Sequence, residues 1–174
     1  MTSLVVTILG PDRPGLVSAV SDRATAHGAN WADSVMANFA GQFAGIVHLQ
    51  VPAQNCAALM AELAALQSPN LHIALSLGAD GSTEPPRRLQ LDLLGHDRPG
   101  IIHSISSQLA HHGVSIEKLQ THIASGAMSG EQMFHMSAQL SVPRALDSDT
   151  LRNSLEGLAN ELMVDISFED GASA

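Results

Sequence analysis

Residues 10–15 read Gly10-Pro11-Asp12-Arg13-Pro14-Gly15, and a near copy, Gly95-His96-Asp97-Arg98-Pro99-Gly100, follows at an offset of 85 in a chain of 174 residues. An apolar run precedes each copy. Apolar residues at helical spacing follow it as far as a His-Gly pair, at His27-Gly28 and His112-Gly113. A match of six residues could arise by chance, but flanks that agree in type and spacing indicate a duplicated domain.

From this repeat we predict domain 1 over residues 1–79, a linker over 80–87 and domain 2 over 88–174. The segment from Gly78 to Pro86 is rich in residues that break helices and strands, as is typical of a linker. The expected strands are 3–9, 30–38, 43–51 and 71–77, then 88–94, 115–123, 132–142 and 163–168, and the expected helices are 13–27, 56–66, 98–112 and 151–162. This order predicts an α+β fold of two ferredoxin-like βαββαβ domains in tandem, each an antiparallel four-stranded sheet with helices on one face.

Composition excludes several classes of protein. The formal net charge is −9, with Lys118 as the only lysine, so the chain lacks the basic face that direct binding of nucleic acid requires. The single cysteine, Cys56, excludes an internal disulfide, and its alanine-rich helical surroundings predict a buried structural thiol. The N-terminus has no basic region and no stretch reaches 18 consecutive apolar residues, so we expect a cytoplasmic protein without a membrane segment.

The repeated loop joins an expected strand directly to an expected helix. Asp12 is predicted to cap that helix by accepting a hydrogen bond from the Gly15 amide, because Pro14 has no N–H to donate. Gly15 has no Cβ, which leaves the other amides of the first turn open to a carboxylate, at the positive end of the helix dipole. The alternative interpretation is a well-capped helix start and nothing more. Two copies that each keep an arginine, which capping does not require, favour a functional loop.

Histidines and candidate nucleophiles give no comparable pattern. Five of the histidines in the second half lie on one expected helix and its neighbouring strands, but they lack the spacing of a metal-binding motif and are expected to be solvated or at helix ends: His103, His111, His112, His122 and His135. The sequence shows no nucleophile motif and no nucleotide-binding loop. We therefore expect a protein that is not an enzyme and that uses no metal or cofactor.

The succession of apolar strand, Asp-Arg-Pro-Gly, two aliphatic residues, helix, His-Gly and second strand resembles the ACT domain. ACT domains are small modules that bind amino acids and regulate metabolic enzymes and transcription. Two such modules with little else resemble the glycine cleavage system transcriptional repressor family. The stretches at 30–36, 41–45 and 127–134 strengthen this resemblance, which extends from about residue 3 to residue 168.

The resemblance implies a ligand site where two modules meet, between the first strand–helix loop and the start of the second strand. The residues implied in the first copy are Gly10, Asp12, Arg13, Pro14, Gly15, Leu16, Asn30 and Asp33, and those in the second copy are Gly95, Asp97, Arg98, Pro99, Gly100 and Ile101. Ser115 and Glu117 stand near the places of Asn30 and Asp33. We therefore expect the first site to bind an amino acid better than the second.

Three hypotheses follow for the function. In the first, the chain is an amino-acid-responsive regulator that binds glycine or serine and restrains a DNA-binding transcription activator through protein contact. In the second, it is a stand-alone regulatory subunit of an amino-acid metabolic enzyme, and in the third it is an oligomerisation module with an empty pocket. In addition, we expect the two halves to pair and the chain to form a homo-oligomer.

Overall fold

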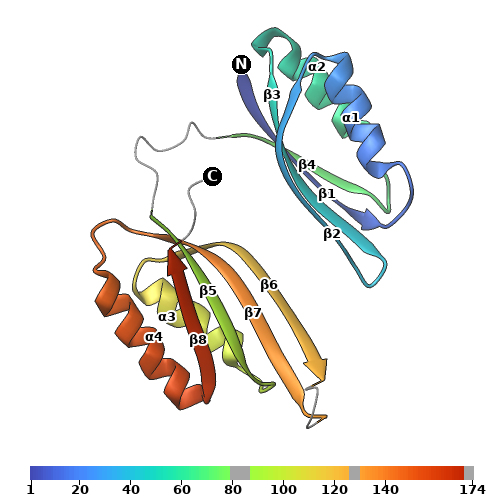
Figure 1. The fold of residues 1–174 in the computed structure, drawn as a ribbon. Helices are drawn as coiled ribbons and strands as arrows, with labels where there is room; N and C mark the ends of the chain where they lie inside the picture. The colour runs from blue at the N-terminus through green and yellow to red at the C-terminus, as the bar shows by residue number, and fades with distance from the viewer. Residues whose placement is uncertain (79–86, 126–129, 171–174) are drawn as a thin grey trace. The chain divides into compact units, whose positions relative to one another are not determined.

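The computed structural model describes residues 1–78, 87–125 and 130–170. The chain divides into two units, Met1–Ser82 and Thr83–Ala174, which we call domain 1 and domain 2. In its described residues, each unit contains one sheet and two helices (Figure 1).

Domain 1 is a four-stranded antiparallel sheet whose two helices cover one face (Figure 1). Its elements are β1 (Thr2–Pro11), α1 (Leu16–Ala26), β2 (Asn30–Phe39), β3 (Gln42–Val51), α2 (Ala53–Ala64) and β4 (His72–Leu77). The strands lie in the order β2-β3-β1-β4, so the first strand is central and the second is at an edge.

Domain 2 repeats this topology. Its elements are β5 (Arg87–His96), α3 (Ile101–His111), β6 (Ser115–Ser125), β7 (Gln132–Val142), α4 (Ser148–Leu162) and β8 (Val164–Asp170). The strands lie in the order β6-β7-β5-β8. The predicted fold, two ferredoxin-like domains in tandem, is confirmed.

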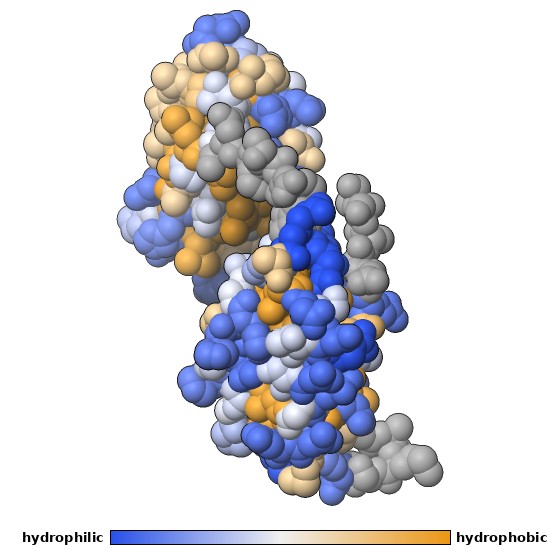
Figure 2. All heavy atoms as spheres, turned by 90° about the vertical axis from the view of Figure 1, so that its left-hand side faces the viewer, coloured by the Kyte–Doolittle hydropathy of each residue, from blue (hydrophilic) through white to orange (hydrophobic). Residues whose placement is uncertain are grey.

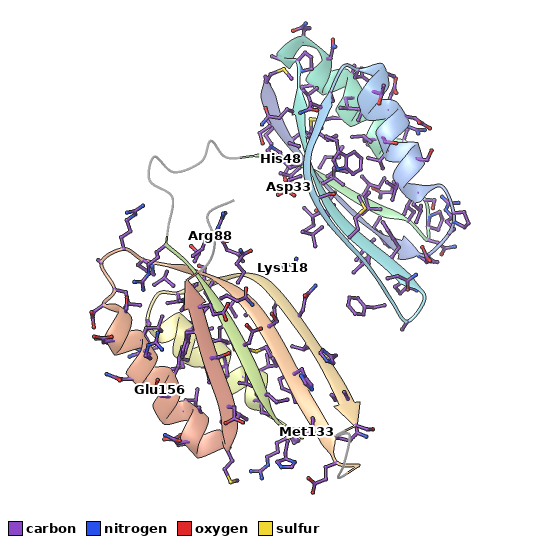
Figure 3. The ribbon with its side chains drawn as sticks, viewed as in Figure 1. Asp33, His48, Arg88, Lys118, Met133 and Glu156 are labelled. Carbon is purple, nitrogen blue, oxygen red and sulfur yellow. The ribbon has the colours of Figure 1, made fainter. Side chains whose placement is uncertain are left out.

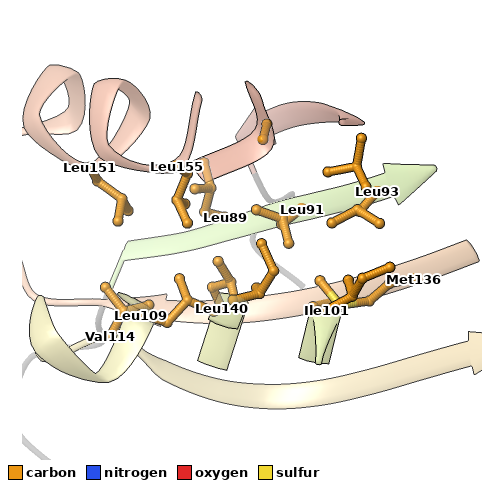
Figure 4. Close-up of a cluster of buried hydrophobic side chains, with 14 of the residues drawn as sticks. Leu89, Leu91, Leu93, Ile101, Leu109, Val114, Met136, Leu140, Leu151 and Leu155 are labelled. Carbon is orange, nitrogen blue, oxygen red and sulfur yellow. The ribbon is translucent and has the colours of Figure 1, made fainter. Parts of the chain in front are cut away.

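Alternating apolar residues build each core. In β1, Leu4, Val6 and Ile8 are fully buried under the helices, while the residues between them lie on the opposite face of the sheet. The core of domain 2 is made in the same way and contains, among others, Leu89, Leu91, Leu93, Ile105, Leu109, Leu140, Leu151 and Leu155 (Figure 4). Cys56 of α2 is buried in the core of domain 1, as predicted.

The hairpins fix which face each strand presents. Ala40 and Gly41 form the two-residue turn between β2 and β3. Their φ values are 50° and 78°, and such a tight turn requires positive φ at both positions. Near its start β2 carries a β-bulge that leaves Ala32 unpaired between Trp31 and Asp33. In domain 2 the equivalent bulge leaves Glu117 unpaired in β6.

Candidate ligand-binding site

The Asp-Arg-Pro-Gly loop connects the end of β1 to α1. The Asp12 amide donates to the Gly41 carbonyl at 2.9 Å, which ties the start of the loop to the β2–β3 hairpin. Gly15 lies at φ +89°, a conformation that favours glycine, and its carbonyl accepts the first helical hydrogen bond, from the Ala19 amide at 2.9 Å. The loop therefore needs Gly15 for its backbone conformation.

The second loop has the same backbone geometry. The Asp97 backbone amide donates to the Gln132 carbonyl at 2.9 Å. Gly100 has φ +96°, and its carbonyl accepts a hydrogen bond from the Ser104 amide at 2.9 Å. Two loops of one conformation explain why the motif repeats so closely in the sequence.

The prediction that Asp12 caps the helix is wrong. The helix begins at Leu16, three residues later than expected, with Gly15 before it and no side-chain cap. The Asp12 carboxylate instead accepts a hydrogen bond from Nδ2 of Asn38, at 2.6 Å. Because Pro14 and Gly15 form a turn before the helix, Asp12 stands too far upstream to act as its cap. α3 likewise begins at Ile101 without a side-chain cap, and not at residue 98.

The sequence pattern does not single out Asn38, because its contact with Asp12 depends on strand register. It pairs with Phe43, which in turn pairs with Gly10, so the register of the hairpin places the end of β2 near the end of β1. In domain 2 the residue at this place is Ile123, which cannot donate a hydrogen bond to Asp97.

The start of α1 has free hydrogen-bond donors as a consequence. Among the described residues, the Leu16, Val17 and Ser18 amides donate no hydrogen bond to a backbone or side-chain acceptor. First-turn amides and the positive end of the helix dipole together favour an anion such as a carboxylate. A Cβ built on Gly15 would meet no atom within 4 Å, so this side of the turn is open.

A small hollow lies beneath the same turn. It has a volume of about 70 Å³ and is lined by Arg13, Pro14, Gly15 and Leu16 from the loop, and by apolar residues of β1, α1 and β4 such as Ile8, Val20 and Ile73. Its mostly apolar lining suits a short aliphatic group better than a charged one.

The implied site residues fall into groups with different roles in the structure. Asp12, Arg13 and Pro14, like their counterparts Asp97, Arg98 and Pro99, are exposed on the loops, while Leu16 and Ile101 are buried in the cores. Gly10 and Gly95 are explained by packing. A Cβ on Gly10 would lie 2.6 Å from the Asn70 carbonyl oxygen, and one on Gly95 would lie 2.4 Å from Cγ1 of Val164.

Asn30 and Asp33 lie toward the other end of the sheet. Asn30 pairs with Gln50, which pairs with Ser3, nine residues before Asp12 along β1 and so about 30 Å away. Asp33 pairs with His48 on the face away from the helices (Figure 3). Within one domain these residues cannot share a small ligand with the Asp-Arg-Pro-Gly loop, so a site that uses both must take them from two modules.

Four of the nine histidines form two ring pairs. The rings of His122 and His135 stack with their centroids 4.5 Å apart, and those of His111 and His112 meet edge to face at 5.6 Å. The described residues include no group of three or more side chains arranged to hold a metal ion. In the same parts of the chain, no helix is long and apolar enough to span a membrane.

Comparison with known proteins identifies the family. The family model of the ACT domain matches residues 2–74 and 87–169. A protein of unknown function from Galdieria sulphuraria is 28% identical, with a TM-score of 0.81 over 98% of this chain and 99% of that chain. The structure of a "putative glycine cleavage system transcriptional repressor" is 20% identical, with a TM-score of 0.71 over 99% of this chain and 98% of that chain. No curated protein sequence matches the chain. Because the family model matches both halves, the chain belongs to the ACT domain family, with two ACT domains in tandem.

Proposed function

We propose that this chain is an amino-acid-responsive regulator that binds a small amino acid such as glycine or serine and acts on a protein partner. The observation that carries this proposal is the start of α1, where three consecutive amides have no acceptor among the described residues. The hollow of about 70 Å³ beneath the same turn supports it, because a ligand carboxylate on the amides would lie beside space for a short side chain.

The expected affinity is modest. Glycine has about five heavy atoms, and a ceiling of about 1.5 kcal/mol per heavy atom limits its Kd to about micromolar or weaker. Such an affinity suits the sensing of an abundant metabolite. The ligand can change the activity of the partner only by the difference in its affinity for two states of the regulator.

The partner proposed first is a DNA-binding transcription activator. A net charge of −9 opposes direct contact with DNA but favours a basic protein surface. The alternative partner is an enzyme of amino-acid metabolism. Affinity capture with the full chain distinguishes them: recovery of a DNA-binding regulator supports the first, and recovery of a metabolic enzyme supports the second.

Calorimetry with glycine, serine and alanine tests the ligand site. We expect heat of binding for the wild type and a Kd weakened about tenfold or more by Gly15→Val, which places a branched side chain at the open side of the turn. Gly100→Val is the matched control, because it makes the same change at the same backbone conformation in domain 2. We expect it to leave the main binding event unchanged.

Two results would overturn the ligand proposal. One is the absence of heat with any amino acid tested against the wild type. The other is an equal Kd for the wild type and Gly15→Val when circular dichroism shows that both are folded.

A further inference from the structure

The face of the domain 1 sheet that the helices leave uncovered carries many apolar side chains, with polar ones such as Thr7, Gln42 and His72 between them. Eight apolar side chains share it, from all four strands, and we call them the apolar face: Val5, Leu9, Val35, Ala37, Phe39, Ala44, Ile46 and Ala74. Their exposure is high for apolar residues, at 72% for Phe39, 58% for Val35, 53% for Ile46 and 48% for Leu9. In Figure 2, where this side of domain 1 turns toward the viewer, apolar surface gathers on it.

The equivalent face of domain 2 is polar. Where domain 1 has the row Ala74, Thr7, Ile46 and Val35 across its strands, domain 2 has Ser167, Asp92, Ser137 and Gln120. That face of domain 2 holds a hollow of about 370 Å³ whose lining includes Asp92, Asp165, His122 and His135. A polar outer face is usual for an antiparallel sheet covered on one side only, so it is domain 1 that departs from the expected pattern.

We propose that the apolar face is a self-association surface, on which a second copy of the chain packs domain 1 against domain 1. Face-to-face packing of two sheets is a common way to bury apolar sheet faces. A two-fold axis would place the same face on both sides of the contact. The inference does not depend on the proposed ligand.

Polarity argues for a second copy and against the matching face of domain 2. Placing Val35 and Ile46 against Asp92 and Gln120 would remove water from a carboxylate and an amide without giving them partners, which is unfavourable. A copy of domain 1 presents apolar atoms to apolar atoms instead. Among the described sheet faces without helices, only that of domain 1 offers this match.

Charge argues in the same direction. Residues 1–77 contain four acidic and two basic residues, whereas residues 87–170 contain eleven acidic and six basic residues. Among residues 1–78, Asp33 is the single acidic residue on the uncovered face, beside His48. Two copies therefore meet less repulsion through domain 1 than through domain 2.

The shape and size of the face suit a weak dimer. The short side chains of Ala37 and Ala44 form a low row between the taller row of Val35 and Ile46 and the side chain of Phe39, so that two copies can interdigitate. From strand spacing and rise, the face measures on the order of 500 Å² in each copy. Two copies would bury on the order of 1,000 Å², at the lower end of specific interfaces, so we expect association in the micromolar range.

Sedimentation equilibrium on the full chain over a wide concentration range tests the proposal. We expect the wild type to approach twice the 18.2 kDa of one chain as the concentration rises. Leu9→Lys and Ile46→Lys should each raise the dissociation constant about tenfold or more, because each brings like charges together in an apolar contact. The matched control is Leu94→Lys, at the position of domain 2 that corresponds to Leu9, and it should leave the constant unchanged.

Crosslinking reports the face directly. With a short bismaleimide, Ala44→Cys should give a covalent dimer, and His135→Cys, at the corresponding position of domain 2, should not; Cys56 is buried in both proteins. Ile46→Thr, which keeps a β-branched side chain, replaces Ile46→Lys if the lysine variant does not fold. A wild type that stays monomeric at several hundred micromolar would overturn the proposal. So would a dimer that the domain 1 variants leave intact, or one that Leu94→Lys weakens equally.

Discussion

Gly10 and Gly95 illustrate how a single residue limits the spacing of strands. Each lies at the end of the central strand of its domain, where the neighbouring segment approaches closely. At Gly10 the nearest neighbour is a backbone carbonyl oxygen, whereas at Gly95 it is the side chain of Val164. The same residue type is thus required for two different reasons.

We expect Gly10→Ala and Gly95→Ala to lower the free energy of unfolding of their domains by about 1–3 kcal/mol, since the added Cβ forces its neighbour to move. The two sites should differ in whether a second substitution restores the lost stability. Val164→Ala removes the Cγ1 atom that a Cβ at position 95 would meet at 2.4 Å, so the double variant should be more stable than the sum of the single changes predicts.

Denaturant unfolding of the wild type, Gly95→Ala, Val164→Ala and the double variant measures these free energies of unfolding. Leu71→Ala is the control at the other site. It should not rescue Gly10→Ala, because the closest contact there is the Asn70 carbonyl oxygen, which side-chain truncation leaves in place. Strict additivity of Gly95→Ala and Val164→Ala would contradict the packing explanation.

At the scale of elements, the helices begin in two different ways. α4 is capped by Asp147, whose carboxylate accepts hydrogen bonds from the Thr150 amide at 2.9 Å and from the Thr150 hydroxyl at 3.0 Å. α1 and α3 begin after a glycine with positive φ and have no side-chain cap. α2 also begins without a side-chain cap, after Pro52, so the glycine with positive φ, and not the missing cap, distinguishes the helix starts of the repeated loop.

The cap of α4 predicts a dependence of stability on pH. The hydrogen bond from the Thr150 amide, and to a lesser degree that from its hydroxyl, lowers the pKa of Asp147 below the usual value of 3.8 for an aspartate. A folded-state pKa below the unfolded value means that the cap stabilises domain 2 above about pH 3.8 and that this contribution is lost as the pH falls through the lower, folded-state value.

Melting curves of Asp147→Ala and Asp147→Asn test this dependence. Near pH 7 we expect Asp147→Ala to melt a few degrees below the wild type. Asp147→Asn should melt close to the wild type, because asparagine is a comparable cap. The difference between wild type and Asp147→Ala should shrink toward pH 3. A difference that stays constant down to that pH would contradict the role of the carboxylate.

The sequence predicted these elements well because apolar periodicity reports burial directly. Leu89, Leu91 and Leu93 alternate as a half-buried strand must, and the structure buries all three. The sequence predicts the starts of α1 and α3 three residues too early, at 13 and 98 instead of 16 and 101. Asp12 and Asp97 have side chains suited to capping, and only the backbone turn excludes that role. The Asn38 contact and the separation of Asn30 from the loop depend on strand register, which connects residues far apart in the chain.

At the scale of the whole molecule, one sequence encodes two separate cores. In the part of the chain that the structure describes, every buried apolar residue belongs to one of two clusters, one formed by residues 4–73 and the other by residues 89–164. The pairing of the two halves stays a prediction. Separate cores imply that each half carries the interactions that it needs to fold.

We therefore expect residues 1–82 and 83–174, expressed separately, to fold and to unfold cooperatively. Domains of this size can be stable alone, although they bury a smaller share of their surface than larger ones do. Circular dichroism and thermal melting of each fragment measure this. A fragment that shows no cooperative transition would mean that its core depends on the other half.

The bulge near the start of β2 has a consequence for every later residue of that strand. Because Ala32 has no partner, the alternation of side chains slips by one place, and Asp33, Val35 and Ala37 point outward while Met36 points toward the helices. Pairing that residue with His48 in a regular ladder would turn the rest of the strand inside out, sending an aspartate toward the leucines and a methionine into water. A single unpaired alanine thus determines which side chains of β2 face solvent and which face the core.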